Sequence, residues 1–144
     1  MQDPEELLHK ELTERIISCY YNVYNELGPG HLESVYEEAM QIALDECGVH
    51  AQRQVPVPVW FHGKRIGDFR ADMLVEGKVI LELKTARAID LAHQAQLMHY
   101  LKATQIEVGL LLNFGEHPAF RRIVFSNERK KIRGNPRKSA VGVS

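Results

Sequence analysis

Residues 53–84 constrain the fold of this chain most, because they contain three strand-like segments in a row with very little between them. The short segments 62–64 and 76–77 have turn-forming sequences, and their flanks are rich in β-branched and aromatic residues. Strands joined by turns this short pair antiparallel with their neighbours. The sequence therefore predicts an antiparallel meander with strands at residues 53–61, 65–75 and 78–84.

Helical patterns lie on both sides of this meander. Before it, apolar residues recur at three- and four-residue intervals in two segments, which Gly28-Pro29-Gly30 separates. After it come a third helical segment, an apolar run typical of a buried strand, and a last strand. We expect helices at residues 5–27, 32–47 and 89–103, and strands at residues 108–113 and 121–125.

The order α-α-β-β-β-α-β-β predicts one α/β domain over residues 1–126. A helix that crosses over from the meander to a further strand places that strand beside the meander, in a mixed β-sheet flanked by helices. Pro56 and Pro58 share one parity, which favours an edge position for the first strand. Residues 127–144 are polar and basic without periodicity, so we expect a flexible C-terminal tail there.

Composition excludes several classes of protein. No apolar run approaches the ~20 residues that a membrane-spanning helix needs, and the first six residues, MQDPEE, lack the features of a signal peptide. Two cysteines cannot build a disulfide framework or supply the four thiolates of an iron–sulfur cluster. We expect a reduced cytoplasmic protein without a membrane partner, and nothing in the sequence indicates homo-oligomerisation.

The formal net charge of −1 hides an uneven distribution of charge. Residues 1–120 hold 10 basic and 18 acidic residues, a net charge of −8. Residues 121–144 hold eight basic residues and one acidic residue, a net charge of +7. This basic end favours contact with a polyanion, and the alternative is a solvated terminus.

Two acids in the meander suggest a site. Alternation places Glu82 and Lys84 on one face of the strand 78–84. A two-residue turn at 76–77 would put Asp72 on the opposite face from Glu82, so a bulge or a longer turn must shift the register by one residue before they share a face. Two carboxylates that meet favour Mg²⁺ or Mn²⁺, with Lys84 beside a metal-bound water. The alternative is a solvated Glu/Lys pair on a half-exposed strand.

Two helical spacings add candidates. Gln96 and Tyr100 lie four residues apart, and therefore on one face of the helix 89–103. Glu33 and Tyr36 lie three residues apart at the start of the helix 32–47. Taken alone, each is better explained by structure, Glu33 as an acid that complements a helix N-terminus and Tyr36 as a core aromatic residue.

Together these residues resemble the PD-(D/E)xK nuclease superfamily. One segment resembles the signature of its GxxExxY protein family, a second the D…(D/E)xK motif, and a third the QxxxY motif of its RecB-like branch. The position before the aspartate is Ala71, where the name of the superfamily has proline. The residues that carry the resemblance are Gly30, Glu33 and Tyr36, then Asp72 and Glu82-Leu83-Lys84, then Gln96 and Tyr100.

The resemblance implies a restriction-endonuclease-like core that brings Asp72 and Glu82 together around Mg²⁺ or Mn²⁺. The resemblance implies that the metal ion is held by Glu33, Asp72, Glu82 and the Leu83 carbonyl. It implies that the catalytic residues are Asp72, Glu82 and Lys84, with Lys84 positioning the attacking water. It also implies that the substrate is contacted by Gln96 and Tyr100. The resulting hypothesis is a metal-dependent nuclease that hydrolyses phosphodiester bonds, preferentially in DNA. The alternatives are a catalytically silent module of the same fold that binds nucleic acid or a protein, and a small interaction domain that uses the seven scattered histidines.

Overall fold

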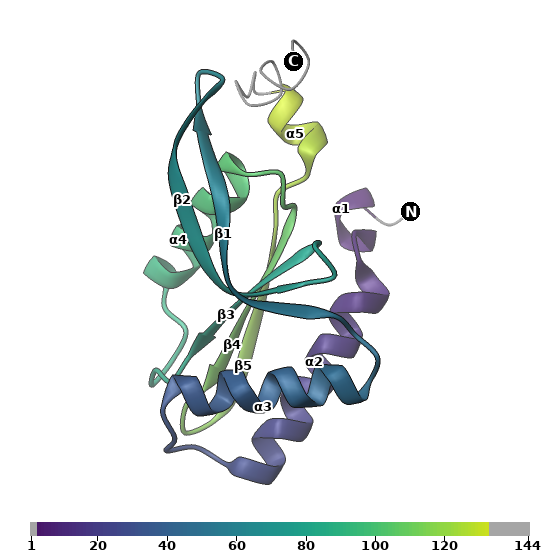
Figure 1. Ribbon diagram of the computed structural model, residues 1–144, viewed down its shortest axis with the longest axis vertical. Coiled ribbons are helices and arrows are strands. Elements are labelled where there is room, and N and C mark those ends of the chain that lie inside the picture. The colour runs from purple at the N-terminus through teal and green to yellow at the C-terminus, as the bar shows by residue number, and fades with distance from the viewer. Residues whose placement is uncertain (1–2, 133–144) are drawn as a thin grey trace.

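A five-stranded mixed sheet with the order β1-β2-β3-β4-β5 organises the computed structural model, which describes residues 3–132 (Figure 1). Strands β1, β2 and β3 form the expected antiparallel meander, β4 pairs parallel with β3, and β5 pairs antiparallel with β4. The predicted α/β fold with a mixed sheet is confirmed, and β1 lies at an edge as its prolines indicate. The strands are β1 (Ala51–Phe61), β2 (Lys64–Val75), β3 (Val79–Lys84), β4 (Val108–Phe114) and β5 (Pro118–Val124).

Helices cover both faces of the sheet. Side chains of α2 and α3 form one hydrophobic core with Leu81 and Leu110, and side chains of α4 form a second core with Ile80 and Leu111 on the opposite face. No helix among residues 3–132 combines the length and the apolar character needed to cross a bilayer. The helices are α1 (Pro4–Leu7), α2 (Lys10–Leu27), α3 (Glu33–Glu46), α4 (Leu91–Ala103) and α5 (Asn127–Ile132).

Both ends of the described chain differ from the prediction. The expected first helix is divided, because His9 adopts a left-handed conformation (φ 51°) between α1 and α2. The expectation of irregular chain after Ser126 is wrong for residues 127–132, which form α5. Lys130 anchors this helix, since its buried Nζ donates to the carbonyls of Thr104 (2.7 Å) and Ile106 (2.9 Å). The rest of the expected tail, residues 133–144, lies outside the described residues.

Part of the basic end therefore belongs to the folded domain. Arg122 lies in β5 and donates to the carbonyl of Leu8 at 2.6 Å, and Arg129 in α5 forms an ion pair with Glu5 at 3.2 Å. Arg122 thus ties the end of α1 to the sheet, and Arg129 ties α5 to α1. The net charge of +7 is thus not carried by a tail alone.

The turn between β2 and β3 is one residue longer than predicted. Val75 pairs with Val79, so residues 76–78 form the turn, and the predicted two-residue turn is wrong. Glu76 (φ 53°) and Gly77 (φ 66°) are both left-handed, and the amide of Glu76 donates to the carbonyl of His50 at 2.8 Å. The additional residue provides the register shift that brings the two strand acids onto one face.

Candidate active site

Asp72 and Glu82 face each other across β2 and β3. They are the next residues of the two strands after the paired Met73 and Leu81. The amide of Asp72 donates to Glu82 Oε2 at 3.0 Å, and the amide of Leu83 donates to Asp72 Oδ2 at 2.8 Å. Each carboxylate is thus fixed to the backbone of the opposite strand.

Their proximity and burial disfavour charge on both acids. Burial, together with the charge of Asp72, raises the pKa of Glu82 to about 7. Burial and the charges of Glu37 and Glu33 raise the pKa of Asp72, although the Leu83 amide and the charge of Lys84 oppose the shift. Near pH 7 the Glu82 carboxyl is therefore partly protonated.

Lys84 ends β3 on the same face as Glu82, as predicted, and is half-buried. The chain that follows is tightly held. Asn113, its partner on β4, donates through Nδ2 to the Ala86 carbonyl at 2.9 Å and accepts from the Ala86 amide at 3.0 Å. A Cβ atom added to Gly115 would lie 2.1 Å from the same carbonyl oxygen. These contacts fix the backbone that leaves Lys84.

Two acids of α3 raise the pKa of Asp72 through their negative charges. Glu33 is the first residue of the helix and is exposed, and Glu37 follows one turn later. Glu37 accepts from Arg53 Nε at 3.2 Å and from Gln54 Nε2 at 3.3 Å. Glu37 was not among the residues predicted for the site, although its four-residue spacing from Glu33 on one helical face was a usable signal.

Gln54 occupies a special position on β1. It lies between the residues that pair with Met73 and Ala71, and therefore beside Asp72. Its backbone is left-handed (φ 52°), which is uncommon for a residue other than glycine. Its hydrogen bond to Glu37 therefore joins β1 to α3 next to Asp72.

Gly30 and Tyr36 shape the turn that precedes α3. Gly30 has φ 107°, a conformation that side chains rarely permit. The fully buried Tyr36 donates from its hydroxyl to the Gly28 carbonyl at 2.6 Å, accepts from the His31 amide at 3.2 Å, and stacks on Phe114. Tyr36 is thus a core aromatic residue, and the turn that it holds sets where α3 begins.

The predicted substrate-contact residues lie on α4, on the sheet face that also carries Ile80. Tyr100 stacks on Phe69 of β2, with ring centroids 3.7 Å apart and planes inclined by 17°. Gln96 lies one turn earlier and is exposed. Of the scattered histidines, His93 forms a capping box with Asp90 at the start of α4.

The donor chemistry of the acid pair suits a hard divalent cation. Carboxylate oxygens are the ligands that Mg²⁺ and Mn²⁺ prefer, and such an ion would offset the burial and the neighbouring negative charges that raise the two pKa values. Within residues 3–132, however, no three His, Cys, Asp or Glu side chains are grouped closely enough to hold a metal ion. The described chain offers two acids in contact and further acids nearby, and it has no preformed three-carboxylate centre.

Comparison with known proteins agrees with this geometry. The sequence matches the PD-(D/E)XK nuclease superfamily over residues 10–123, and the chain belongs to this superfamily. The solved structure titled "Crystal structure of SSO0001" is similar in fold, with a TM-score of 0.51 and 20% sequence identity, over 94% of this chain and 68% of that chain. A search of curated proteins found no match. The predicted superfamily and its restriction-endonuclease-like fold are confirmed, and membership suggests nuclease activity.

Proposed function

We propose that this chain is a metal-dependent nuclease that hydrolyses phosphodiester bonds of nucleic acid, with DNA as the preferred substrate. The observation that carries the proposal is the contact between Asp72 and Glu82, each hydrogen-bonded to the opposite strand. Lys84 ends the same strand face, and its positive charge opposes the rise in the pKa values of both acids. The motif residues support a finer assignment to the GxxExxY family, within the RecB-like branch of the superfamily.

In this proposal Asp72 and Glu82 hold Mg²⁺ or Mn²⁺, together with the Leu83 carbonyl and Glu33. A divalent ion bound there would polarise the scissile phosphate and lower the pKa of a bound water. The Lys84 ammonium would hydrogen-bond that water and stabilise the negative charge that develops on the phosphate. The Leu83 amide keeps the Asp72 carboxylate oriented toward β3.

Other residues would position the site and its substrate. Glu37 would extend the acidic surface of α3, held by Arg53 and Gln54. Gln96 and Tyr100 would contact the nucleic acid from α4, with the Tyr100 ring held in place by Phe69. The basic residues 121–144 would add attraction for phosphates that the acidic residues 1–120 do not supply.

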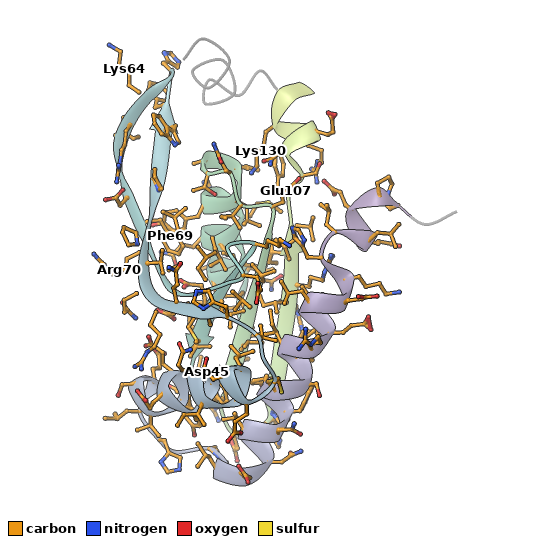
Figure 2. The ribbon with its side chains drawn as sticks, turned by 45° about the vertical axis from the view of Figure 1, so that its right-hand side comes forward. Asp45, Lys64, Phe69, Arg70, Glu107 and Lys130 are labelled. Carbon is orange, nitrogen blue, oxygen red and sulfur yellow. The ribbon has the colours of Figure 1, made fainter. Side chains whose placement is uncertain are left out.

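The direct test is cleavage of single- and double-stranded DNA in Mg²⁺ or Mn²⁺, with EDTA as the metal-free control. Asp72→Asn and Lys84→Met should each lower the rate by about 10³-fold. Asp45→Asn is the matched control, because Asp45 is an exposed acid far along α3 that accepts from Gln41 (Figure 2). Absence of cleavage with either ion, or cleavage by Asp72→Asn at the wild-type rate, would refute the proposal.

A second candidate is a catalytically silent nuclease-fold module that binds nucleic acid. The observation that favours it is the lack of a preformed three-ligand group among residues 3–132. This candidate predicts DNA binding that weakens steeply with salt, and no cleavage under any metal condition. Cleavage that depends on Asp72 excludes it.

A further inference from the structure

The β1–β2 hairpin extends well beyond the sheet. Strand β2 pairs with β3 at Met73–Val75, whereas it pairs with β1 along nearly its whole length. Residues 55–71, called the arm from here on, rise away from the other strands, with Lys64 at the tip (Figures 1 and 2). At the usual rise per residue, the arm is about 20 Å long.

The tip of the arm exposes rings that a stable hairpin does not need. Phe61 is 56% exposed, and its ring stacks on that of His62 with centroids 4.0 Å apart and planes inclined by 12°. Ile66 is 64% exposed and has no partner on β1, because the register shifts beside it. Bulges of this kind redirect side chains, and exposed apolar clusters often mark binding surfaces.

The turn at the tip is well defined. His62 (φ 48°) and Gly63 (φ 75°) both have positive φ, as a two-residue type I′ turn requires. Such turns match the twist of the two strands that they join. The stacked ring pair is therefore carried on a regular hairpin rather than on a long loop.

The charge of the arm is opposite to that of the surrounding chain. Its basic residues are Lys64, Arg65 and Arg70, and its only acid is Asp68, which forms an ion pair with Arg65. Residues 1–120 as a whole have a net charge of −8. The arm is thus a local cationic element on an acidic domain, and its charge complements phosphate.

The base of the arm is fixed beside the acid pair. Phe69 stacks on Tyr100 of α4, and Arg70 Nη1 donates to the Gln54 carbonyl at 2.7 Å. Asp72 is the next residue of β2 after the arm ends at Ala71. A ligand that lies along the arm is therefore led to the Asp72–Glu82 contact.

We propose that the arm captures single-stranded nucleic acid and leads it to the acid pair. The Phe61–His62 ring pair stacks on an unpaired base, and Lys64 and Arg65 contact the adjacent phosphates. In a duplex the faces of the bases are covered by their neighbours, so the arm favours single strands or unpaired ends. This inference rests on the proposed function for the identity of the ligand, and it adds the form of nucleic acid that the site receives.

Tryptophan fluorescence can report binding of nucleic acid to the arm. Trp60 is the only tryptophan of the chain, and it lies in the arm next to Phe61. Its fluorescence is followed while a thymidine 20-mer, or a duplex of the same length, is added to the full chain in EDTA. We expect a saturable change with the single strand, at least tenfold tighter than with the duplex.

Variants then locate the contact. Phe61→Ala should weaken single-strand binding about tenfold, and Phe61→Tyr, which keeps the ring, should restore it. Changing both Lys64 and Arg65 to Gln should also reduce the slope of log K against log salt by roughly 1.4. Lys10→Gln, an exposed lysine on α2, is the matched control and should bind as the wild type does.

Duplex binding as tight as single-strand binding, or an unchanged affinity in Phe61→Ala, would overturn the inference. Because the titration contains EDTA, neither result depends on cleavage. Single-strand binding that depends on Phe61 supports the arm even if the chain cleaves nothing, and cleavage that depends on Asp72 without such binding supports the nuclease and rejects the arm.

Discussion

The two halves of β2 differ in environment although they form one continuous strand. In the inner half, Met73 and Val75 are fully buried and Asp72 is tied to the Leu83 amide. In the outer half, which belongs to the arm, Arg65 and Asp68 form an ion pair in solvent and Ile66 is exposed. The inner half can hold two acids at close range because strands on both sides fix the backbone. The outer half has one neighbouring strand, and its side chains face solvent at the tip, whereas Phe69 and Ala71 at its base are buried.

Because of this contrast, the effect of a substitution on stability can be separated from its effect on function. A change in the inner half alters burial, register and the electrostatics of the acid pair together, so it affects both stability and chemistry. A change at the exposed tip of the outer half leaves the core untouched and affects only what the arm binds. The following predictions test that separation, from the largest expected effect to the smallest.

Deletion of Val79 should have the largest effect. With the three-residue turn 76–78 kept, Ile80 takes the place of Val79 opposite Val75, so every later residue of β3 changes face and Asp72 and Glu82 no longer share one. We expect a loss of stability on the order of 3 kcal/mol in urea unfolding, and loss of any metal-dependent cleavage. Lys78→Ala, at the neighbouring exposed turn residue, keeps the register and should change stability by less than about 0.5 kcal/mol. A deletion variant with wild-type stability and cleavage would show that register does not build the site.

Glu82 should make the stability of the metal-free protein depend on pH. Its folded-state pKa of about 7 lies above the usual value of 4.5, so the folded state binds the proton more tightly than the unfolded state does. The stabilising contribution is complete below about pH 4.5 and is lost as the pH rises through 7, by up to about 3 kcal/mol.

Chemical unfolding of wild type and Glu82→Gln between pH 4 and 8 measures this contribution. The difference in unfolding free energy between the two should move in favour of Glu82→Gln as the pH rises. Asp45→Asn should show no such trend, because Asp45 is an exposed acid on α3. A difference that stays constant with pH, or one that moves in favour of the wild type, would contradict the electrostatic account of the pair.

Two glycines give the smallest effect and compare the two regions directly. A Cβ on Gly115 would lie 2.1 Å from the Ala86 carbonyl oxygen in the loop after Lys84, whereas a Cβ on Gly67 of the arm meets nothing within 4 Å. We expect Gly115→Ala to destabilise the fold by roughly 2 kcal/mol and Gly67→Ala to change stability by less than about 0.5 kcal/mol. Equal unfolding midpoints for the two variants would show that Gly115 is no more tightly packed than Gly67, against the account.

Much of the fold could be predicted because its patterns are local. Apolar periodicity located the three main helices, and the continuous apolar run 108–113 identified a strand that is buried along its whole length. The two-residue alternation placed Glu82 and Lys84 on one face, and the structure agrees. These features depend on the spacing of neighbouring residues, which the sequence states directly.

The remaining features depend on contacts between distant segments. The longer turn needs Glu76 in a left-handed conformation, which its backbone contact with His50 supports and its residue type does not signal. Helix α5 has no apolar periodicity, and it is held by a buried Lys130 that donates to carbonyls of the α4–β4 connection.

The site shows the same division. Asp72 and Glu82 were predicted from the sequence, but the register shift that places them on one face had to be assumed. Glu37 has a helical spacing from Glu33, but its contact with Gln54 and its effect on Asp72 join segments that are far apart in sequence. The stacking of Tyr100 on Phe69 likewise joins α4 to a strand that no spacing connects to it.

The measurement that tests the central claim most directly is calorimetric titration of Mn²⁺ into the wild-type protein, Asp72→Asn and Asp45→Asn. If Asp72 and Glu82 form a metal site, the wild type and Asp45→Asn should bind one ion per chain, and Asp72→Asn should lose the binding heat while remaining folded. Binding of equal strength in Asp72→Asn, or no binding by the wild type, would contradict the account.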